Sequence, residues 1–231
     1  MAELYHVLNR GVEKRKIFSD DKDYFRFVHD LFEFNDKERV NNVFYRFQNN
    51  DLRGHYIKQT QERRKREFLV KIHGFCLMPN HFHLLLSQQM EGGIPKFLNK
   101  LSAGYSKYFN TKYERVGPLF QGRYKRVLIK NQRQLLYILF YIHLNPLDLF
   151  RPEWRDRELK DHREAIRFLE NYRWSSHLDY CGKKNFPSVT QRDFFIEFFG
   201  GPIDYKKSLY GWLKDLELES ISPFALEDVL I

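Results

Sequence analysis

The sequence predicts an α+β protein built around an antiparallel sheet, and two observations carry that prediction. The expected elements run strand, helix, strand, strand and helix along the chain, which is the order of an α+β domain. Two of the strands are separated only by a Pro-Asn turn at residues 79 and 80, which favours their pairing with each other.

The N-terminal elements are a strand and a helix. Residues 5–9 alternate weakly and form a strand, which Arg10-Gly11 breaks. The run Ser19-Asp20-Asp21 caps a helix over about residues 22–34. One face of that helix carries its apolar residues, which are Tyr24, Phe27, Val28, Leu31 and Phe32.

Residues 35–68 are polar and charged, and we interpret them as a basic insertion. They include the run Gln-Glu-Arg-Arg-Lys-Arg-Glu at residues 61–67. The insertion is either a helical hairpin or a mobile basic loop. A charge run of this kind is more often a solvated face than a binding site.

Further strands follow the insertion. Residues 68–73 and 74–78 form strand, and so do residues 81–87 after the Pro-Asn turn. The simplest arrangement is a pair of strands with the two histidines at the start of the second. The run Gly92-Gly93-Ile94-Pro95 then opens a helix that reaches about Asn110.

The chain changes character near residue 151. Residues 111–130 form loop and strand, and Asn131 caps a helix over residues 132–145, which Pro146 ends. Beyond this point the pattern is rich in Trp, Arg and Asp and is then punctuated by Pro and Gly. We expect one domain over residues 1–150 and a C-terminal extension over residues 151–231 that packs on it.

Composition points to a nucleic-acid partner. The 231 residues carry a formal net charge of +9 and are 17% aromatic, a combination typical of nucleic-acid binding. The alternative is a basic protein with no polyanionic partner. Two cysteines are too few for a disulfide framework, which favours a reducing, cytoplasmic setting. We expect no membrane association, because no signal peptide or membrane-spanning run is present.

The stretch Met-Pro-Asn-His-Phe-His-Leu-Leu-Leu, residues 78–86, places two histidines in an apolar strand. Residues i and i+2 of a strand share a face, so His81 and His83 project together, Leu85 continues their face, and Phe82 turns to the opposite layer. Two adjacent imidazoles can bind one metal ion. The alternative is two ordinary strand histidines, although buried imidazoles cost desolvation energy unless something satisfies them.

The stretch Tyr-Ile-His-Leu-Asn-Pro, residues 141–146, lies at the end of the last predicted helix of the domain. Tyr141 and Asn145 share one helical face. Asn145 offers an amide oxygen, which hard divalent cations accept, and Tyr141 offers a phenol nucleophile. If this helix packs on the histidine face, the site suits metal-assisted phosphodiester cleavage. The alternative is that Tyr141 is a core or surface aromatic.

Four separated stretches together resemble a known family. Pro-Asn-His-Phe-His-Leu-Leu-Leu is similar to the HUH motif (His, hydrophobic, His) of the HUH endonucleases. The other three stretches are Arg-Val-Gly-Pro-Leu-Phe-Gln-Gly-Arg-Tyr-Lys at 115–125, Tyr-Ile-His-Leu-Asn-Pro at 141–146, and Tyr-Arg-Trp-Ser-Ser-His at 172–177. Together the four stretches resemble the single-tyrosine HUH transposases, and among them the REP-associated tyrosine transposases. The resemblance covers about residues 5–34 and 68–180.

The resemblance implies a fold, a reaction and a set of site residues. The fold would be the ferredoxin-like HUH endonuclease fold. The reaction would be Mg²⁺- or Mn²⁺-dependent cutting and joining of single-stranded DNA with a hairpin, through a 5′-phosphotyrosine intermediate. His81 and His83 would be metal ligands, with Asn145 in the place of the third, amide ligand, where other branches have Gln. Tyr141 would be the nucleophile, and Tyr105 and Tyr108 on the preceding helix are its rivals.

The segment 115–130 interleaves cations with aromatic residues, as single-stranded DNA binding requires. Arg123 and Lys125 fall on one face of a strand, and Tyr124 turns to the other. The alternative is a solvated edge strand with ordinary core aromatics. Together with the turn near residue 10, the candidate DNA-binding residues are Asn9, Arg10, Arg115, Gln121, Arg123, Lys125 and Arg126.

Three functional hypotheses follow. The first is an active transposase-like nuclease at REP-like hairpins, the second a domesticated DNA-binding protein of the same fold without transposition, and the third a metal-binding enzyme or scaffold unrelated to DNA. The set His81, His83 and Tyr141 favours the first over the second, and the net charge with four ordered motifs disfavours the third. No sustained apolar heptad indicates a partner helix, so we expect a monomer rather than a homodimer.

Overall fold

The computed structural model describes residues 3–38, 66–156 and 158–215, so most of the predicted insertion lies outside the described residues. In this part of the chain the sheet has four strands, β1 (Leu4–Arg10), β2 (Val70–Met78), β3 (His81–Gln88) and β4 (Lys125–Ile129). Their order is β2-β3-β1-β4, and each neighbouring pair is antiparallel. With one helix after β1 and one after β3, this is the ferredoxin-like βαββαβ topology, and the predicted fold class is confirmed.

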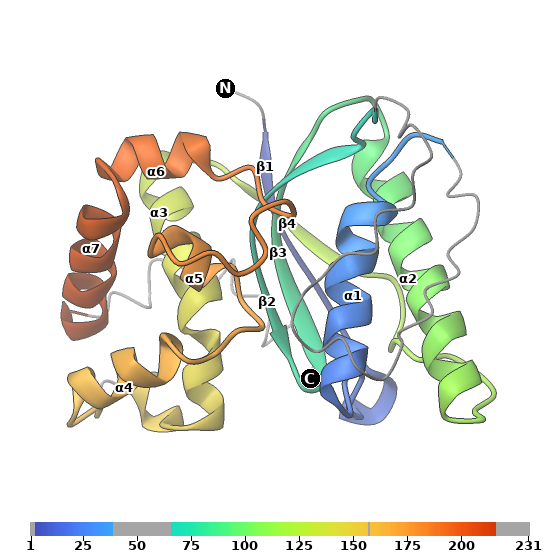
Figure 1. Ribbon diagram of the computed structural model, residues 1–231, viewed down its shortest axis with the longest axis horizontal. Coiled ribbons are helices and arrows are strands. Elements are labelled where there is room, and N and C mark those ends of the chain that lie inside the picture. Colours follow the sequence, from blue (N-terminus) through green and yellow to red (C-terminus); the bar gives the residue numbers. More distant parts are fainter. Residues whose placement is uncertain (1–2, 39–65, 157, 216–231) are drawn as a thin grey trace.

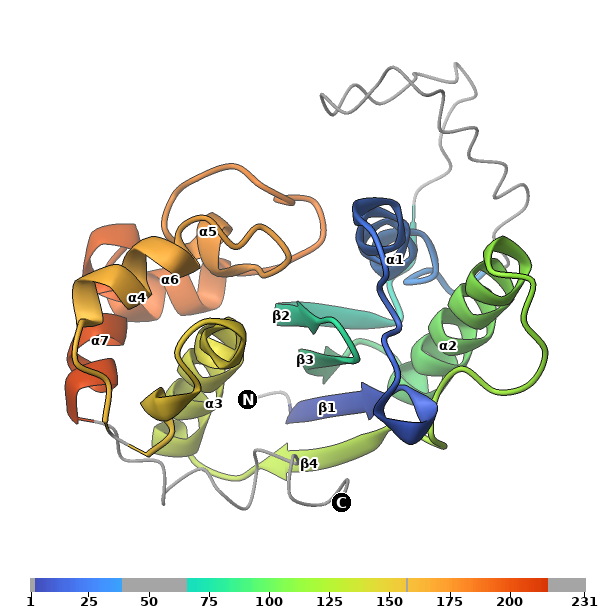
Figure 2. The same cartoon turned by 90° about the horizontal axis from the view of Figure 1, so that it is seen from below.

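Helices cover both faces of the sheet. The helices α1 (Asp21–Glu33) and α2 (Gly93–Lys112) lie on one face, and α3 (Gln132–Leu144) lies on the other (Figure 2). The predicted caps are present: Asp20 Oδ1 accepts from the Asp23 N–H at 3.1 Å, and Asn131 Oδ1 accepts from the Gln134 N–H at 2.9 Å. Among the described residues, no helix is both long and apolar enough to cross a bilayer.

The strand β2 is continuous, although the sequence predicts two pieces that meet at residues 73 and 74. Its pairing with β3 shifts register between Ile72 and Gly74, which leaves His73 as an extra residue. Because of this extra residue, Ile72 pairs with Leu86 and Gly74 pairs with Leu85, and regular pairing continues on both sides. The hairpin that follows puts His81 at the first position of β3, as predicted.

The sheet separates two apolar cores. Phe82, Leu84 and Leu86 of β3 are buried in the core under α1 and α2, where Phe27 of α1 contacts Phe82 at 5.0 Å between ring centroids. Leu85 is buried in the other core, against α3. The predicted division of β3 into two faces is therefore confirmed.

The C-terminal elements pack on α3 (Figure 1). Tyr205 and Leu209 share a core cluster with Leu139 and Phe140 of α3. The elements are the short 3-10 turns η2 (Asn145–Leu149) and η3 (Pro152–Trp154) and the helices α4 (His162–Leu169), α5 (His177–Tyr180), α6 (Asp193–Phe199) and α7 (Pro202–Asp215). A further 3-10 turn, η1 (Val12–Lys14), follows β1.

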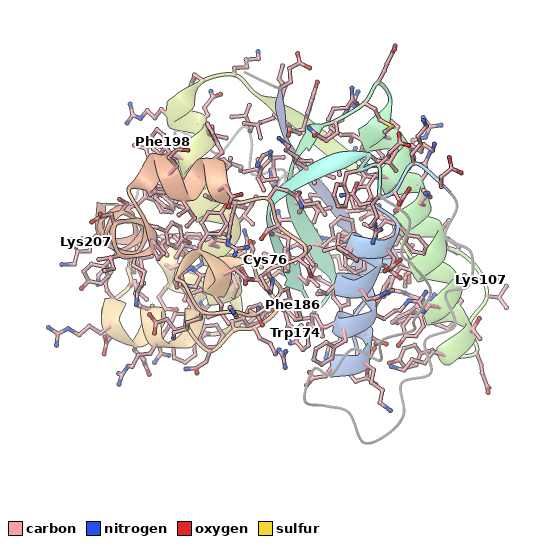
Figure 3. All side chains as sticks on the ribbon, turned by 45° about the horizontal axis from the view of Figure 1, so that its top comes forward. Cys76, Lys107, Trp174, Phe186, Phe198 and Lys207 are labelled. Carbon is pink, nitrogen blue, oxygen red and sulfur yellow. The ribbon has the colours of Figure 1, made fainter. Side chains whose placement is uncertain are left out.

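A segment between α4 and α5 covers the β2 edge of the sheet. The Leu77 N–H donates to the carbonyl of Trp174 at 2.9 Å, and the Ser176 N–H donates to the carbonyl of Phe75 at 3.0 Å. The Trp174 ring stacks on Tyr24 of α1, with 4.7 Å between ring centroids. Figure 3 shows Trp174 and Phe186 between the C-terminal helices and α1. The C-terminal residues thus join both layers at this edge.

Candidate active site

His81 and His83 lie on the face of β3 that α3 covers. Their ring centroids are 4.9 Å apart, and the ring planes are nearly perpendicular. His83 is fully buried, and His81 is 7% exposed. Solvent therefore reaches the pair from the side of His81, where Arg10 of β1 is the pairing partner.

A hydrogen bond sets the tautomer of His81. Its Nδ1 lies 2.6 Å from Asn80 Oδ1, and the Asn80 amide nitrogen donates to the Lys14 carbonyl at 3.3 Å, which fixes the amide orientation. An amide oxygen only accepts, so Nδ1 of His81 carries the proton. Nε2 is then the ring nitrogen through which His81 would bind a metal.

A third histidine, which sequence analysis missed, supports His83. His6 of β1 stacks on His83 with 5.2 Å between ring centroids, and His6 Nε2 lies 2.9 Å from His83 Nδ1. Such a bond orients a ligand ring and makes Nε2 the atom through which His83 would bind a metal. Spacing could not reveal His6, because the contact is diagonal across two strands that are neighbours only in the folded sheet.

The electrostatics keep His83 neutral. Its pKa is lowered to about 3, chiefly by burial and further by the positive charges of Arg155 and Arg10. Metal binding requires an unprotonated imidazole, so His83 is in the correct state at neutral pH.

The helix α3 places Tyr141 beside the histidines. The Tyr141 ring stands edge-on to His83, with 5.9 Å between ring centroids, and is 1% exposed. One turn later, Asn145 is fully buried, and its amide nitrogen donates to the Tyr141 carbonyl at 2.9 Å. The predicted packing of the tyrosine helix on the histidine face is observed.

Arg155, just beyond η3, completes this arrangement, and sequence analysis missed it as well. Its Nη1 donates to Tyr141 Oη at 3.3 Å, and its Nη2 donates to Asn145 Oδ1 at 3.3 Å. The two residues predicted to share a helical face therefore meet at one guanidinium. No spacing rule connects an arginine to a tyrosine across two 3-10 turns.

The rival tyrosines lie on the opposite side of the sheet. Tyr105 and Tyr108 belong to α2, where the Tyr105 hydroxyl donates to the Ile17 carbonyl at 2.5 Å and the Tyr108 hydroxyl donates to Asp23 at 3.0 Å. Burial raises the pKa of both phenols. Neither is near the histidine pair, so Tyr141 is the tyrosine that the fold brings to the site.

The basic candidates divide between the two faces of the sheet. Lys125 pairs with Leu8 and so lies on the histidine face, whereas Arg126 pairs with Val7 and lies over the Tyr5 ring on the other face. Gln121 and Arg123 are exposed in the loop before β4, and the Gln121 N–H donates to the Arg10 carbonyl at 2.9 Å.

Two candidates are placed apart from this surface. Asn9 is only 3% exposed, and its amide bonds to the Arg10 N–H and the Gly122 carbonyl, so it supports the turn from beneath. Arg115 lies just beyond α2 and donates to Asn110 at 2.8 Å. The structure therefore brings Arg10, rather than Asn9 or Arg115, to the histidines.

The imidazole pair fits a divalent cation, and the third position is less complete. Both rings have their Nδ1 atoms engaged, and Nε2 is the ligand atom in each. Asn145 Oδ1 accepts a bond from Arg155, so it must release that bond to bind a metal. Within the described ranges no group of three or more His, Cys, Asp or Glu residues is placed to hold a metal ion, so we expect an amide or water as the third ligand.

Comparison with known proteins identifies the family. The model of the family described as "Transposase IS200 like" matches residues 4–145, from β1 to the end of α3. The chain belongs to the IS200-like transposase family. A solved structure of a REP-associated tyrosine transposase bound to a REP hairpin shares 10% sequence identity, over 81% of this chain and 84% of that chain, with a TM-score of 0.45. No curated protein matches the chain.

Proposed function

We propose that this transposase-family protein is a metal-dependent single-stranded DNA endonuclease and strand transferase that works through a 5′-phosphotyrosine intermediate. The observation that carries the proposal is the position of Tyr141, whose ring stands edge-on to His83 at 5.9 Å between centroids. A phenol, two imidazoles and an amide oxygen together suit phosphodiester transfer and have no evident use in a purely structural core.

The chain's own groups account for the steps of the reaction. Tyr141 Oη attacks the phosphorus, and the bond to the 3′-oxygen breaks to leave a 3′-hydroxyl. A bound Mg²⁺ or Mn²⁺, held by His81, His83 and either Asn145 or water, would stabilise charge on the phosphate. Because the phosphotyrosine bond replaces the phosphodiester bond that breaks, the bond energy is retained for rejoining.

We propose that DNA approaches along the rim of the histidine face. Arg10 and Lys125 lie on this face, and Arg123 is exposed in the adjoining loop. Three cations around a strand end suit the phosphates of a single strand. A hairpin beside that strand is the substrate that the motifs imply through their similarity to the REP-associated transposases. Because one chain supplies all these groups, we propose a monomer as the acting unit.

A denaturing-gel assay tests the proposal. Wild type is incubated with single-stranded DNA from the flanks of its gene, including any hairpin, in the presence of Mn²⁺ or Mg²⁺ or with EDTA. We expect a covalent protein–DNA adduct that needs the metal and is lost in Tyr141→Phe. Tyr137→Phe, one turn earlier on α3, is the matched control and should still form the adduct.

Any other result of this assay supports a different function. An adduct that persists in Tyr141→Phe places the nucleophile elsewhere, and Tyr105→Phe and Tyr108→Phe would then be tested. Binding without cleavage under either metal supports the domesticated DNA-binding protein. A chain that ignores DNA but binds the metal supports a function unrelated to DNA.

A further inference from the structure

Arg155 lies against the candidate nucleophile, although it comes from outside the residues that the family model matches. The match ends at residue 145, and Arg155 follows η3 in the C-terminal extension. Its guanidinium carbon is 5.2 Å from the centroid of the Tyr141 ring, and its Nη1 bonds to the phenol oxygen. The C-terminal extension therefore contributes a side chain that hydrogen-bonds to the candidate nucleophile.

The guanidinium is held in a fixed orientation. Arg155 Nε donates to Asp148 Oδ1 at 2.8 Å, and Nη2 donates to Asp148 Oδ2 at 2.7 Å. The indole N–H of the fully buried Trp154 donates to the same carboxylate at 2.7 Å. This bidentate ion pair with Asp148 directs Nη1 at Tyr141, and a lysine could not form it.

The Arg155 side chain is fixed by its hydrogen bonds but remains partly exposed to solvent. The Arg155 side chain is 27% exposed, whereas Tyr141 is 1% exposed. The cation at the phenol oxygen is therefore in reach of solvent on its own side.

We propose that Arg155 is a catalytic residue of the transfer reaction, donating from Nη1 to Tyr141 Oη and to a non-bridging oxygen of the scissile phosphate. The inference rests on the proposed function. In the step, the Oη–P bond forms and the P–O3′ bond breaks, the phenol proton passes to solvent, and the 3′-oxygen gains a proton from solvent. A fixed donor aimed at developing negative charge is the most effective form of such assistance. Asp148 and Trp154 are positioning residues, because they act through Arg155.

Three variants test the role of Arg155. Arg155→Gln removes the charge, Arg155→Lys keeps it without the fork, and Arg151→Gln removes a charge from the same segment. The Arg151 side chain pairs with Glu164 at 2.9 Å and not with Tyr141 or Asp148, so it is the matched control. We expect Arg155→Gln to slow adduct formation by about 100-fold or more. Arg155→Lys should recover part of this rate, and Arg151→Gln should match the wild type.

Two further readouts separate catalysis from folding. In Arg155→Gln, the pH at which adduct formation reaches half its plateau should move upward, while the thermal unfolding midpoint stays near that of Arg151→Gln. In a Tyr141→Phe background, which cannot cleave, Arg155→Gln should lower the slope of log affinity for single-stranded DNA against log salt by about 0.7, as expected for one phosphate contact.

The outcomes distinguish this inference from the proposed function. If the wild type forms the adduct and Arg155→Gln forms it equally fast, the inference is overturned and the proposed function stands. If the rate of adduct formation in Arg155→Gln and Arg155→Lys falls only in proportion to the folded fraction of each variant, Arg155 is structural and the inference is again overturned. If the wild type forms no adduct on any DNA, the proposed function fails and the inference falls with it.

Discussion

The imidazole of His6 lies parallel to that of His83, with a 10° angle between the ring planes and 2.9 Å between His6 Nε2 and His83 Nδ1. This contact joins β1 to β3 on the face that carries Tyr141. It gives one of the two candidate metal ligands an oriented partner inside the protein.

We predict that His6→Ala weakens metal binding without removing a ligand. Loss of a hydrogen bond to a ligand imidazole typically lowers metal affinity by about 10- to 100-fold. Mn²⁺ binding followed by electron paramagnetic resonance measures the effect directly and needs no DNA. His162→Ala, on α4, is the control. Equal Mn²⁺ affinity in the two variants would show that His6 does not support His83.

Lys125 and Arg126 offer a matched pair for DNA binding. They are exposed neighbours of equal charge on opposite faces of β4. We expect Lys125→Ala to weaken binding of single-stranded DNA and to lower the salt slope by about 0.7, because it removes a phosphate contact. Arg126→Ala should change both less, as fluorescence anisotropy at several salt concentrations would show. The reverse order would place the DNA on the α1 and α2 face.

Phe82 fixes the histidine strand from behind. It is fully buried between its histidine neighbours in sequence and contacts Phe27 and Phe120 in the opposite core. Phe82→Ala should lower the free energy of unfolding by about 3–5 kcal/mol, the usual cost of a large buried cavity. Phe198→Ala, at a ring that is 43% exposed, should cost much less. Urea titrations compare the two, and similar losses would contradict the packing described above.

Acid should destabilise the fold through His73. Burial lowers its pKa from 6.5 to about 4, so the unfolded chain binds a proton at a higher pH than the folded protein does. Its contribution to stability is complete above pH 6.5 and is lost as pH falls towards 4. In His73→Gln, the stability lost between neutral pH and about pH 5 should be smaller than in wild type by about 1–2 kcal/mol. His162→Gln is the control, and an unchanged pH dependence in His73→Gln would refute this assignment.

Local rules predicted the parts of the site that lie close in sequence. Alternation along β3 placed His81 and His83 on one face, and the 3.6-residue period placed Tyr141 and Asn145 together. These positions follow from the geometry of a single element. The caps at Asp20 and Asn131 were predictable for the same reason.

The parts that no local rule predicted depend on how elements meet. His6 reaches His83 only because β1 lies next to β3 in this register. Arg155 reaches Tyr141 only because two 3-10 turns after α3 direct the chain back onto it. Conversely, Tyr105 and Tyr108 resembled candidates in sequence until the fold placed them behind the sheet.

The pairing of residues 174–176 with β2 has a consequence for folding during synthesis on the ribosome. A ribosome releases residues 4–145 well before this segment, so the growing chain has a sheet that ends in a bare strand and an α3 whose outer face lacks its cover. A bare strand edge pairs readily with other chains, so we expect residues 174–176 to protect the edge of β2 once they pair with it. Arg155 also arrives late. Copies that end before residue 155 lack the contact between Arg155 and Tyr141, so the complete arrangement forms only after the residues that the family model matches have been synthesised.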